Sequence, residues 1–358
     1  MPAQEHGKKP VVAVLCRCSI RFYSYGKANS RGNPAFQKGV VMRGVTFSSL
    51  VGLSLVLVGG AGMAEAEDIS GLILLPKVIT EDSQLVGDVT CAETATPCID
   101  FGASHITLRL NGFTMTGPAD PDNPSPGFCN ATPGPPAADG IRISEPAQAQ
   151  ALTHSRVLGP GMVQKFRRHG IFIQGTIGIS TNATVRHVTS HHNCFSGIFV
   201  AAVSDSVIEE NVSVRNAVNS GVASCGGNCI ANSHNNRIRR NQFSGNGSVG
   251  PPSNDFGVGL NGNSSGNVIE DNSIGGNTNG ISIQANAVDN VIRRNVIVGN
   301  PPSQVSRTFG ALIGFDVKDE SAVPGSGSRN TIERNWCVTY SGPGPAPCPN
   351  FPGPGPNK

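Results

Sequence analysis

Apolar and polar residues alternate in short stretches along most of the chain, and these stretches recur at a regular spacing. Residues 267–295 run NVIEDNSIGGNTNGISIQANAVDNVIRRN, and the motif around Ile269 returns around Ile292, 23 residues later. A unit of this length is too short for a strand–helix–strand motif and fits one coil of a β-solenoid. Within each unit, the alternation predicts at least two short, half-buried strands.

Two half-motifs occupy matching places in successive units. The first supplies one core aliphatic side chain per coil, at Val157, Val185, Ile208, Ile238, Ile269, Ile292 and Ile332. The second starts with a glycine that precedes an aliphatic-x-aliphatic step, at Gly140, Gly170, Gly197, Gly221, Gly257, Gly280 and Gly310. The segments between the motifs vary in length, as expected for a solenoid that accepts insertions at its turns.

Asparagines and charged residues also form columns when the units are aligned. One asparagine column holds Asn211, Asn241, Asn272, Asn295 and Asn335, and another holds Asn236, Asn267, Asn290 and Asn330. Stacked side-chain amides can hydrogen-bond along such a column. The sign alternates through Arg186, Glu209, Arg239, Glu270, Arg293 and Glu333, and nearly alternates through His187, Glu210, Arg240, Asp271, Arg294 and Arg334. Because opposite charges on stacked coils attract, we predict that this surface joins coil to coil rather than binding a ligand.

These repeats resemble those of right-handed parallel β-helix proteins, the carbohydrate-binding and sugar-hydrolysis class of the pectin lyase-like superfamily, which includes NosD-like periplasmic proteins. The likeness covers residues 106–336, and its opening, ITLRLNGFTMTG, is similar to the first-coil signature ITLDLNGHTITG. The resemblance implies an all-β fold, a single-stranded right-handed parallel β-helix (solenoid). It leaves function open, because this fold hosts lyases, hydrolases, epimerases and non-catalytic binders.

Composition favours one elongated domain over several globular ones, with 45 Gly, 26 Pro and 14% charged residues in 358. The net charge of +3, without a basic run that contains aromatics, argues against a nucleic-acid partner. We expect an upstream extension and signal peptide at residues 1–66, and an N-terminal cap and entry at residues 67–103. The β-helix would then span residues 104–340, and a Pro/Gly-rich tail would follow at residues 341–358.

An N-terminal signal peptide is predicted to begin at the second methionine, Met42. Arg43 supplies the positive region, residues 47–61 the apolar region, and Ala64-Glu65-Ala66 a cleavage site, so that Glu67 starts the mature chain. The apolar run is short and interrupted by serines, which argues against stable membrane insertion. We therefore predict an exported bacterial protein, periplasmic or extracellular.

Cysteines support the same compartment. Eight remain after this cleavage, an even number that suits disulfide formation in an oxidising environment. The pairs that we predict are Cys91 with Cys98, Cys225 with Cys229, Cys337 with Cys348, and Cys129 with Cys194.

Outward positions beside the glycine steps are the first place to look for a site. Between the two aliphatic residues of each step stand Arg142, Phe172, Phe199, Ala223, Gly259, Ser282 and Leu312. This column contains no pair of carboxylates of the kind that a glycosidase needs. Phe172 above Phe199 would suit sugar stacking, although two aromatic rings packed under a loop would show the same pattern.

Two clusters are candidate sites for an acidic sugar. Asp316 and Lys318 stand two residues apart on one predicted strand, where they would suit proton abstraction beside a uronate carboxylate or form an ordinary ion pair. The second cluster is basic and consists of Lys165, Arg167, Arg168, His169, His187, His191 and His192. It would bind uronate or sulfate groups, with His169 as a base near neutral pH, or it is a solvated turn.

No metal site is predicted. His191-His192-x-Cys194 offers soft-metal ligands, but we expect Cys194 in a disulfide. No cofactor is expected, with a divalent cation such as calcium as an open option. The predicted function is binding of an extended anionic polysaccharide, with lyase or epimerase processing left open. The alternative is a non-catalytic envelope or surface scaffold protein, and the sequence leaves the oligomeric state unknown.

Overall fold

The computed structural model describes residues 66–120, 139–144, 152–217, 226–247, 256–300, 304–305, 312–321, 328–342 and 347–348. Chain contacts divide the protein into Met1–Ala61 and Gly62–Lys358, and all the described residues belong to the second unit. Every regular element in the described residues is a β-strand. Accordingly, they include no helix that is long and apolar enough to cross a membrane. The predicted signal peptide and most of the predicted tail lie outside the described residues.

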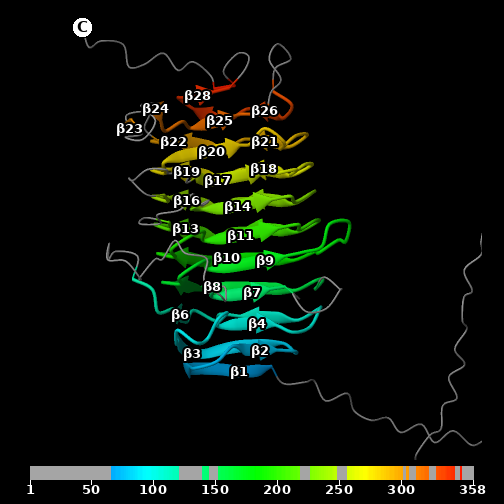
Figure 1. Cartoon of the computed structure of the whole chain (residues 1–358), viewed down its shortest axis with the longest axis vertical. Helices are drawn as coiled ribbons and strands as arrows, with labels where there is room; N and C mark the ends of the chain where they lie inside the picture. The colour runs from blue at the N-terminus through cyan, green and yellow to red at the C-terminus, as the bar shows by residue number, and fades with distance from the viewer. Residues whose placement is uncertain are drawn as a thin grey trace, which may run out of the picture. The chain divides into compact units, whose positions relative to one another are not determined.

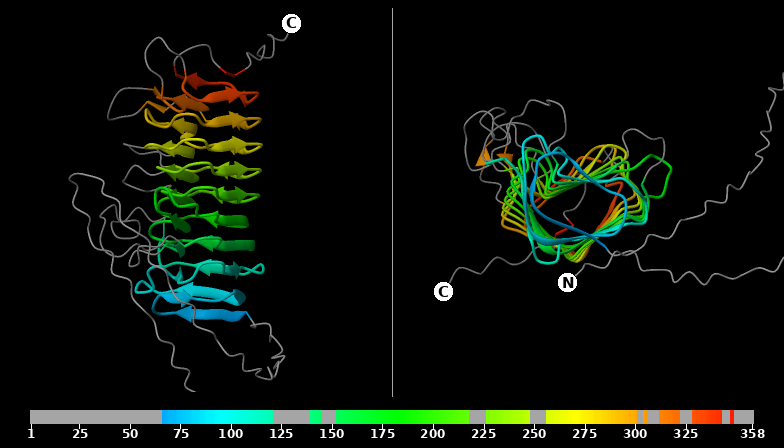
Figure 2. Two further views of the ribbon diagram at one scale, coloured as in Figure 1. Left: turned by 90° about the vertical axis from the view of Figure 1, so that its right-hand side faces the viewer. Right: turned by 90° about the horizontal axis from the view of Figure 1, so that it is seen from below.

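Equivalent strands of successive coils pair in parallel and form a solenoid (Figure 1). Three faces surround its core, as the view along the axis shows (Figure 2). The first face holds β1 (Glu67–Ile73), β3 (Ser83–Cys91), β5 (Thr107–Arg109), β8 (Arg156–Gln164), β10 (Thr184–His191), β12 (Val207–Glu209), β15 (Arg237–Arg239), β18 (Val268–Glu270), β21 (Val291–Arg293) and β26 (Thr331–Glu333).

The second and third faces complete each coil. The second face continues the long strands of the first coils and adds β6 (Thr114–Thr116), β13 (Val212–Val214), β16 (Gln242–Ser244), β19 (Ser273–Gly275), β22 (Val296–Val298) and β27 (Trp336–Cys337). The third face holds β2 (Lys77–Ile79), β4 (Ile99–Phe101), β7 (Ile141–Ile143), β9 (Ile171–Gln174), β11 (Ile198–Ala201), β14 (Asn228–Ala231), β17 (Phe256–Asn261), β20 (Asn279–Ile283), β25 (Val317–Asp319) and β28 (Tyr340–Ser341). A separate antiparallel pair joins β23 (Gln304–Val305) to β24 (Leu312–Ile313).

The predicted core column of the first face is confirmed. Its members pair in register from Val157 through Ile208 and Ile269 to Ile332. All except Ile332 are fully buried, and Ile332, in the last coil of the column, is partly buried. Burial of these aliphatic side chains is the main driving force for stacking the coils.

Most of the described corners between faces are built from a left-handed residue followed by a stacked asparagine. At the corner between the first and second faces, the predicted charged column from His187 to Arg334 adopts φ between 54 and 57°. Such backbone is unfavourable for a residue with a Cβ, and it bends the chain sharply in one step. The asparagine that follows then binds the next coil: the Asn241 Nδ2 donates to the Asn272 Oδ1 at 3.0 Å and to the Ile208 carbonyl at 2.9 Å.

Both predicted asparagine columns are confirmed, and a third occupies the remaining corner. In the described coils it runs through Asn193, Asn216, Asn246, Asn277 and Asn300 and ends at Asp316. All of these side chains are buried, so each lost partner would leave a buried polar group unsatisfied.

Several predicted boundaries differ from the structure. Residues 67–103 were expected to form the cap and entry of the solenoid, and they contain the strands β1 to β4. On the third face, β14 and β25 follow Gly227 and Asp316, so the half-motifs placed at Gly221 and Gly310 were wrong. An insertion separates the repeats at both places, and a glycine of the insertion was mistaken for the residue that precedes the strand.

Two predicted disulfides are confirmed, Cys91–Cys98 and Cys337–Cys348. Cys194 and Cys229 are also disulfide-bonded. The partners expected for them, Cys129 and Cys225, lie outside the described residues, so those two pairs remain predictions.

Candidate functional site

The outward column of the third face is the main candidate site. It stacks Asp100, Arg142, Phe172, Phe199, Cys229, Gly259, Ser282 and Lys318 in register on successive coils. Five of the seven predicted members are confirmed, whereas Cys229 and Lys318 occupy the places assigned to Ala223 and Leu312. Asp100 extends the column by one coil and brings in a carboxylate that the sequence did not reveal.

A two-point ion pair occupies the first coils of this column. The Arg142 Nε donates to one oxygen of Asp100 at 3.0 Å, and its Nη2 donates to the other at 2.5 Å. Hydrogen bonding to the Asp100 carboxylate, which accepts from Arg142, raises the pKa of Arg142, so the guanidinium stays charged. Both side chains are less than one-fifth exposed, which holds their orientation fixed.

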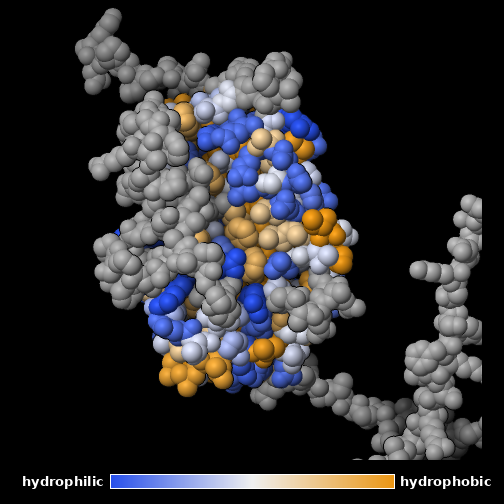
Figure 3. All heavy atoms as spheres, viewed as in Figure 1, coloured by the Kyte–Doolittle hydropathy of each residue, from blue (hydrophilic) through white to orange (hydrophobic). Residues whose placement is uncertain are grey.

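Aromatic rings occupy the next two coils. The Phe172 and Phe199 ring centroids lie 5.5 Å apart, and His169 stacks on Phe199 at 4.6 Å with a 17° angle between the rings. The Arg168 guanidinium lies 5.1 Å from the Phe172 centroid. Phe172 is 7% exposed, whereas Phe199 is only partly buried. Hydrophobic residues therefore gather in the middle of this face, with hydrophilic residues beside them (Figure 3).

His169 is poorly placed to act as the base predicted for it. Its side chain is 4% exposed, and its Nδ1 accepts a hydrogen bond from the Ser196 N–H at 3.3 Å. Burial, with a further contribution from the charge of Arg168, lowers the pKa of His169 well below its usual value. The imidazole is thus neutral with its acceptor nitrogen already used, and we assign it a packing role.

Asp139 is a site residue that the sequence did not single out. Its side chain is fully buried, and its Oδ1 accepts the His169 N–H at 3.2 Å. Among the residues that the structure describes, its Oδ2 has no hydrogen-bond partner, and the Arg168 Nη1 lies 3.8 Å away. Burial raises the pKa of Asp139 to about 6 despite the opposing charge of Arg168. A carboxyl group with such a pKa beside an exposed cation is typical of functional sites.

The predicted basic cluster comes together only in part. Lys165 and His192 stack at the corner between the second and third faces, where the Lys165 N–H donates to the His191 carbonyl at 3.4 Å. The Nδ1 atoms of His191 and His192 lie 2.6 Å apart. Arg167 forms an ion pair with Glu93. These residues flank the third face, so the stacking of the two turns is as predicted.

His187 does not belong to that cluster. It lies at the corner between the first and second faces, where its Nε2 is 3.1 Å from Glu210. Its neighbours form the predicted charge network: Glu209 binds Arg239 and Arg240 at 2.7 and 3.1 Å, and Glu270 binds Arg293 and Arg294, each at 2.8 Å. The prediction that this surface joins coil to coil is confirmed.

Asp316 and Lys318 do not form the predicted catalytic pair. Asp316 is buried at the end of an asparagine column, where its Oδ1 accepts from the Asn300 Nδ2 at 2.9 Å and its Oδ2 accepts from the Val338 N–H at 2.8 Å. Lys318 faces outward and binds Glu320 at 2.6 Å. Strand alternation alone would place the two side chains on one side, but Asp316 belongs to the corner that precedes β25 and points into the asparagine column.

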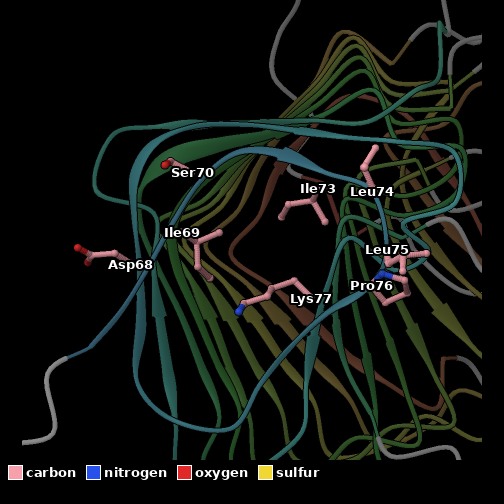
Figure 4. A pocket seen from close by; sticks show the side chains of 8 residues that line it. All are labelled: Asp68, Ile69, Ser70, Ile73, Leu74, Leu75, Pro76 and Lys77. Atoms are coloured by element: carbon pink, nitrogen blue, oxygen red, sulfur yellow. The ribbon is translucent and has the colours of Figure 1, made fainter.

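Two other features of the structure give less support for a functional site. Within the described ranges, no group of three or more His, Cys, Asp or Glu side chains is arranged to hold a metal ion. A cavity of about 340 Å³ opens at the N-terminal end of the solenoid, lined by Asp68, Ile69, Ser70, Ile73, Leu74, Leu75, Pro76 and Lys77 (Figure 4). Its lining is mostly the exposed end of the core, without a cluster of converging polar groups.

This parallel solenoid, with its polar and aromatic outer face, matches a known family. The family model described as "Right handed beta helix region" matches residues 162–342, and the chain belongs to this right-handed β-helix family. None of the curated proteins matches the chain.

Two solved structures are similar in part. The bacteriophage CBA120 tailspike protein 2 enzymatically active domain is 12% identical, with a TM-score of 0.35, and the match covers 73% of this chain and 37% of that chain. The Dettilon tailspike protein is 10% identical, with a TM-score of 0.36, and the match covers 77% of this chain and 60% of that chain. This chain therefore spans less than two thirds of the length of either.

Proposed function

We propose that this protein binds an extended polysaccharide along the third face, across the coils that carry Asp100, Arg142, Phe172 and Phe199. The observation that carries the proposal is the stacking, on adjacent coils, of two outward aromatic rings next to a fixed ion pair. Successive coils lie about 4.8 Å apart, so a chain molecule along the axis would meet a new side chain at each coil.

The chemistry of these side chains suits a sugar. An aromatic ring packs against the apolar face of a sugar ring, and Phe199 is only partly buried, so part of its ring is available for that contact. Guanidinium and carboxylate groups beside it offer directed hydrogen bonds to hydroxyl groups. Because Asp100 and Arg142 already hold each other, they can bind without first losing conformational freedom.

Bond cleavage does not form part of the proposal. The lyase or epimerase chemistry considered for Asp316, Lys318 and His169 loses its support, because Asp316 is buried in a hydrogen-bonded column and His169 is neutral with its acceptor occupied. Export from a bacterial cell stays a prediction, which the Cys91–Cys98 and Cys337–Cys348 disulfides support.

The test is an affinity measurement with the full chain on a panel of neutral and uronic-acid polysaccharides. We expect at least one to bind, and Phe199→Ala to weaken binding about tenfold, the effect of about 1.4 kcal/mol of lost aromatic contact. Arg294→Ala, in the charge network of the first face, is the matched control and should leave affinity unchanged. If no polysaccharide binds, or if Phe199→Ala binds normally, the scaffold alternative replaces the proposal.

A further inference from the structure

The third face also contains a pair of charged residues suited to pH-dependent binding of a ligand. This inference rests on the proposed function. We propose that Asp139 and Arg168 form an acid-operated switch for acidic sugars: when Asp139 is protonated, Arg168 is released to bind the carboxylate of a uronate residue that packs beside Phe172 and Phe199.

The geometry of the pair is the first support. The Arg168 Nη1 and the Asp139 Oδ2 are 3.8 Å apart, too far for a hydrogen bond, and no other group in the described part of the chain hydrogen-bonds to Oδ2. The Asp139 side chain is fully buried, whereas that of Arg168 is 39% exposed. Arg168 thus presents donors to solvent at the edge of the aromatic pair, in reach of a ligand carboxylate that could bind its guanidinium at two points.

The other titratable groups around Asp139 are either paired with each other or neutral. Arg142 from β7 and Asp100 from β4 both act on Asp139, but they are bound to each other at two points. His169, from the turn before β9, offers Asp139 only its backbone N–H, and its imidazole is neutral. Arg168 is therefore the cation near Asp139 that lacks a hydrogen-bonded counterion among the described side chains.

The protonation range makes the switch usable near neutral pH. With a pKa of about 6, Asp139 is largely ionised above neutral pH and largely protonated at pH 5. Ionised Asp139 repels a ligand carboxylate and attracts Arg168, whereas the protonated form does neither. A uronate keeps its own charge across this range, so the change in affinity would come from the protein.

The experiment compares an oligogalacturonate with its neutral methyl ester, at about pH 5 and about pH 7.5. We expect the oligogalacturonate to bind about tenfold more tightly at the lower pH, which corresponds to a shift of about one unit in the pKa of Asp139 on binding. The neutral methyl ester should bind with the same affinity at the two pH values. Asp139→Asn keeps an acceptor for the His169 N–H and should bind the oligogalacturonate tightly at both pH values. Arg168→Gln should remove the preference for the acidic ligand.

The possible failures are distinguishable. Binding of both ligands without pH dependence, or an Asp139→Asn variant that keeps the pH dependence of the parent, overturns the switch and leaves the proposed function standing. Failure of both ligands to bind overturns the switch alone. The proposed function is overturned when the full polysaccharide panel fails to bind or when Phe199→Ala binds normally. Circular dichroism of each variant confirms that it is folded before affinity is compared.

Discussion

Arginine and carboxylate side chains meet on two regions of this solenoid with opposite consequences. On the first face, Arg293 and Arg294 both hydrogen-bond to Glu270. Burial works against ionisation of Glu270, but these two arginines outweigh it and lower its pKa. On the third face, Arg168 stays 3.8 Å from Asp139, burial dominates, and the pKa rises to about 6.

The difference in pKa between the two carboxyl groups comes from where each residue lies in its coil. From Arg186 to Arg334, the corner of the first face places two adjacent ionisable residues on each coil, so Glu209 and Glu270 each meet two arginines from a neighbouring coil at hydrogen-bonding distance. Asp139 lies outside such a column, and the Arg168 guanidinium, 3.8 Å away, forms no hydrogen bond with it. Paired charges on a regular register stabilise the coil, whereas a buried, poorly paired charge costs stability and is a mark of function.

The largest expected effect is that Asp139→Asn stabilises the protein at neutral pH. The pKa of Asp139 is higher in the folded protein, about 6, than its usual 3.8, so the wild-type protein loses stability as pH rises from 3.8 through 6. The loss of folding stability amounts to about 3 kcal/mol and is absent below pH 3.8. Urea unfolding should therefore show a more stable variant at about pH 8 and equal stabilities at about pH 3.5. A variant that is less stable at every pH would contradict the contrast between the two faces.

A second substitution extends the contrast to the core beneath the third face. Asn228 occupies an inward position between Ile198 and Val258, and neither its Oδ1 nor its Nδ2 has a hydrogen-bond partner in the described ranges. Asn228→Val should stabilise the protein by about 2 kcal/mol, because it removes two unsatisfied groups from an apolar site. Thermal unfolding is the measurement.

The matched control for Asn228 is Asn272→Val. Asn272 donates to Asn295 at 2.9 Å and accepts from the Asn241 N–H at 2.9 Å, so the same substitution breaks an intact column. It should lower the melting temperature. Equal effects of the two substitutions would mean that hydrogen-bond satisfaction does not distinguish the two sites.

A smaller effect is expected for Glu270→Gln in the charge network. Arg293 and Arg294 are 35% and 42% exposed, so solvent screens the interaction, and the loss at neutral pH should be about 1 kcal/mol. Because the pKa of Glu270 is lowered on folding, its contribution is present above the usual value of 4.5 and is lost as pH falls through the folded value. Denaturant midpoints of parent and variant should therefore converge in acid, and a gap that persists there would argue against an electrostatic origin.

Most of the fold follows from the sequence because its repeats are local. The core column at Ile269 and the asparagine column at Asn272 each recur at a fixed place in every coil, so aligning the units reveals the register. The third asparagine column was missed because glycines rather than charged residues precede Asn246, Asn277 and Asn300, which made them look like ordinary turns.

The site was harder to predict for a related reason. Asp100 and Arg142 are 42 residues apart, and an insertion separates the coils that carry them. Asp139 follows that insertion directly and belongs to no repeated motif. Phe172 and Phe199 were identified because they occupy equivalent repeat positions, whereas Asp316 was misjudged because its strand starts later than the glycine pattern indicated.

The central claim is that the third face, and not the charge network of the first, meets the polysaccharide. Hydrogen–deuterium exchange with and without a bound polysaccharide tests it directly. We expect slower exchange in peptides that cover β7, β9 and β11 and the turns before them, with β12, β15 and β18 unchanged. Slower exchange confined to β12, β15 and β18 would contradict the account, because it would place the ligand on the charged columns.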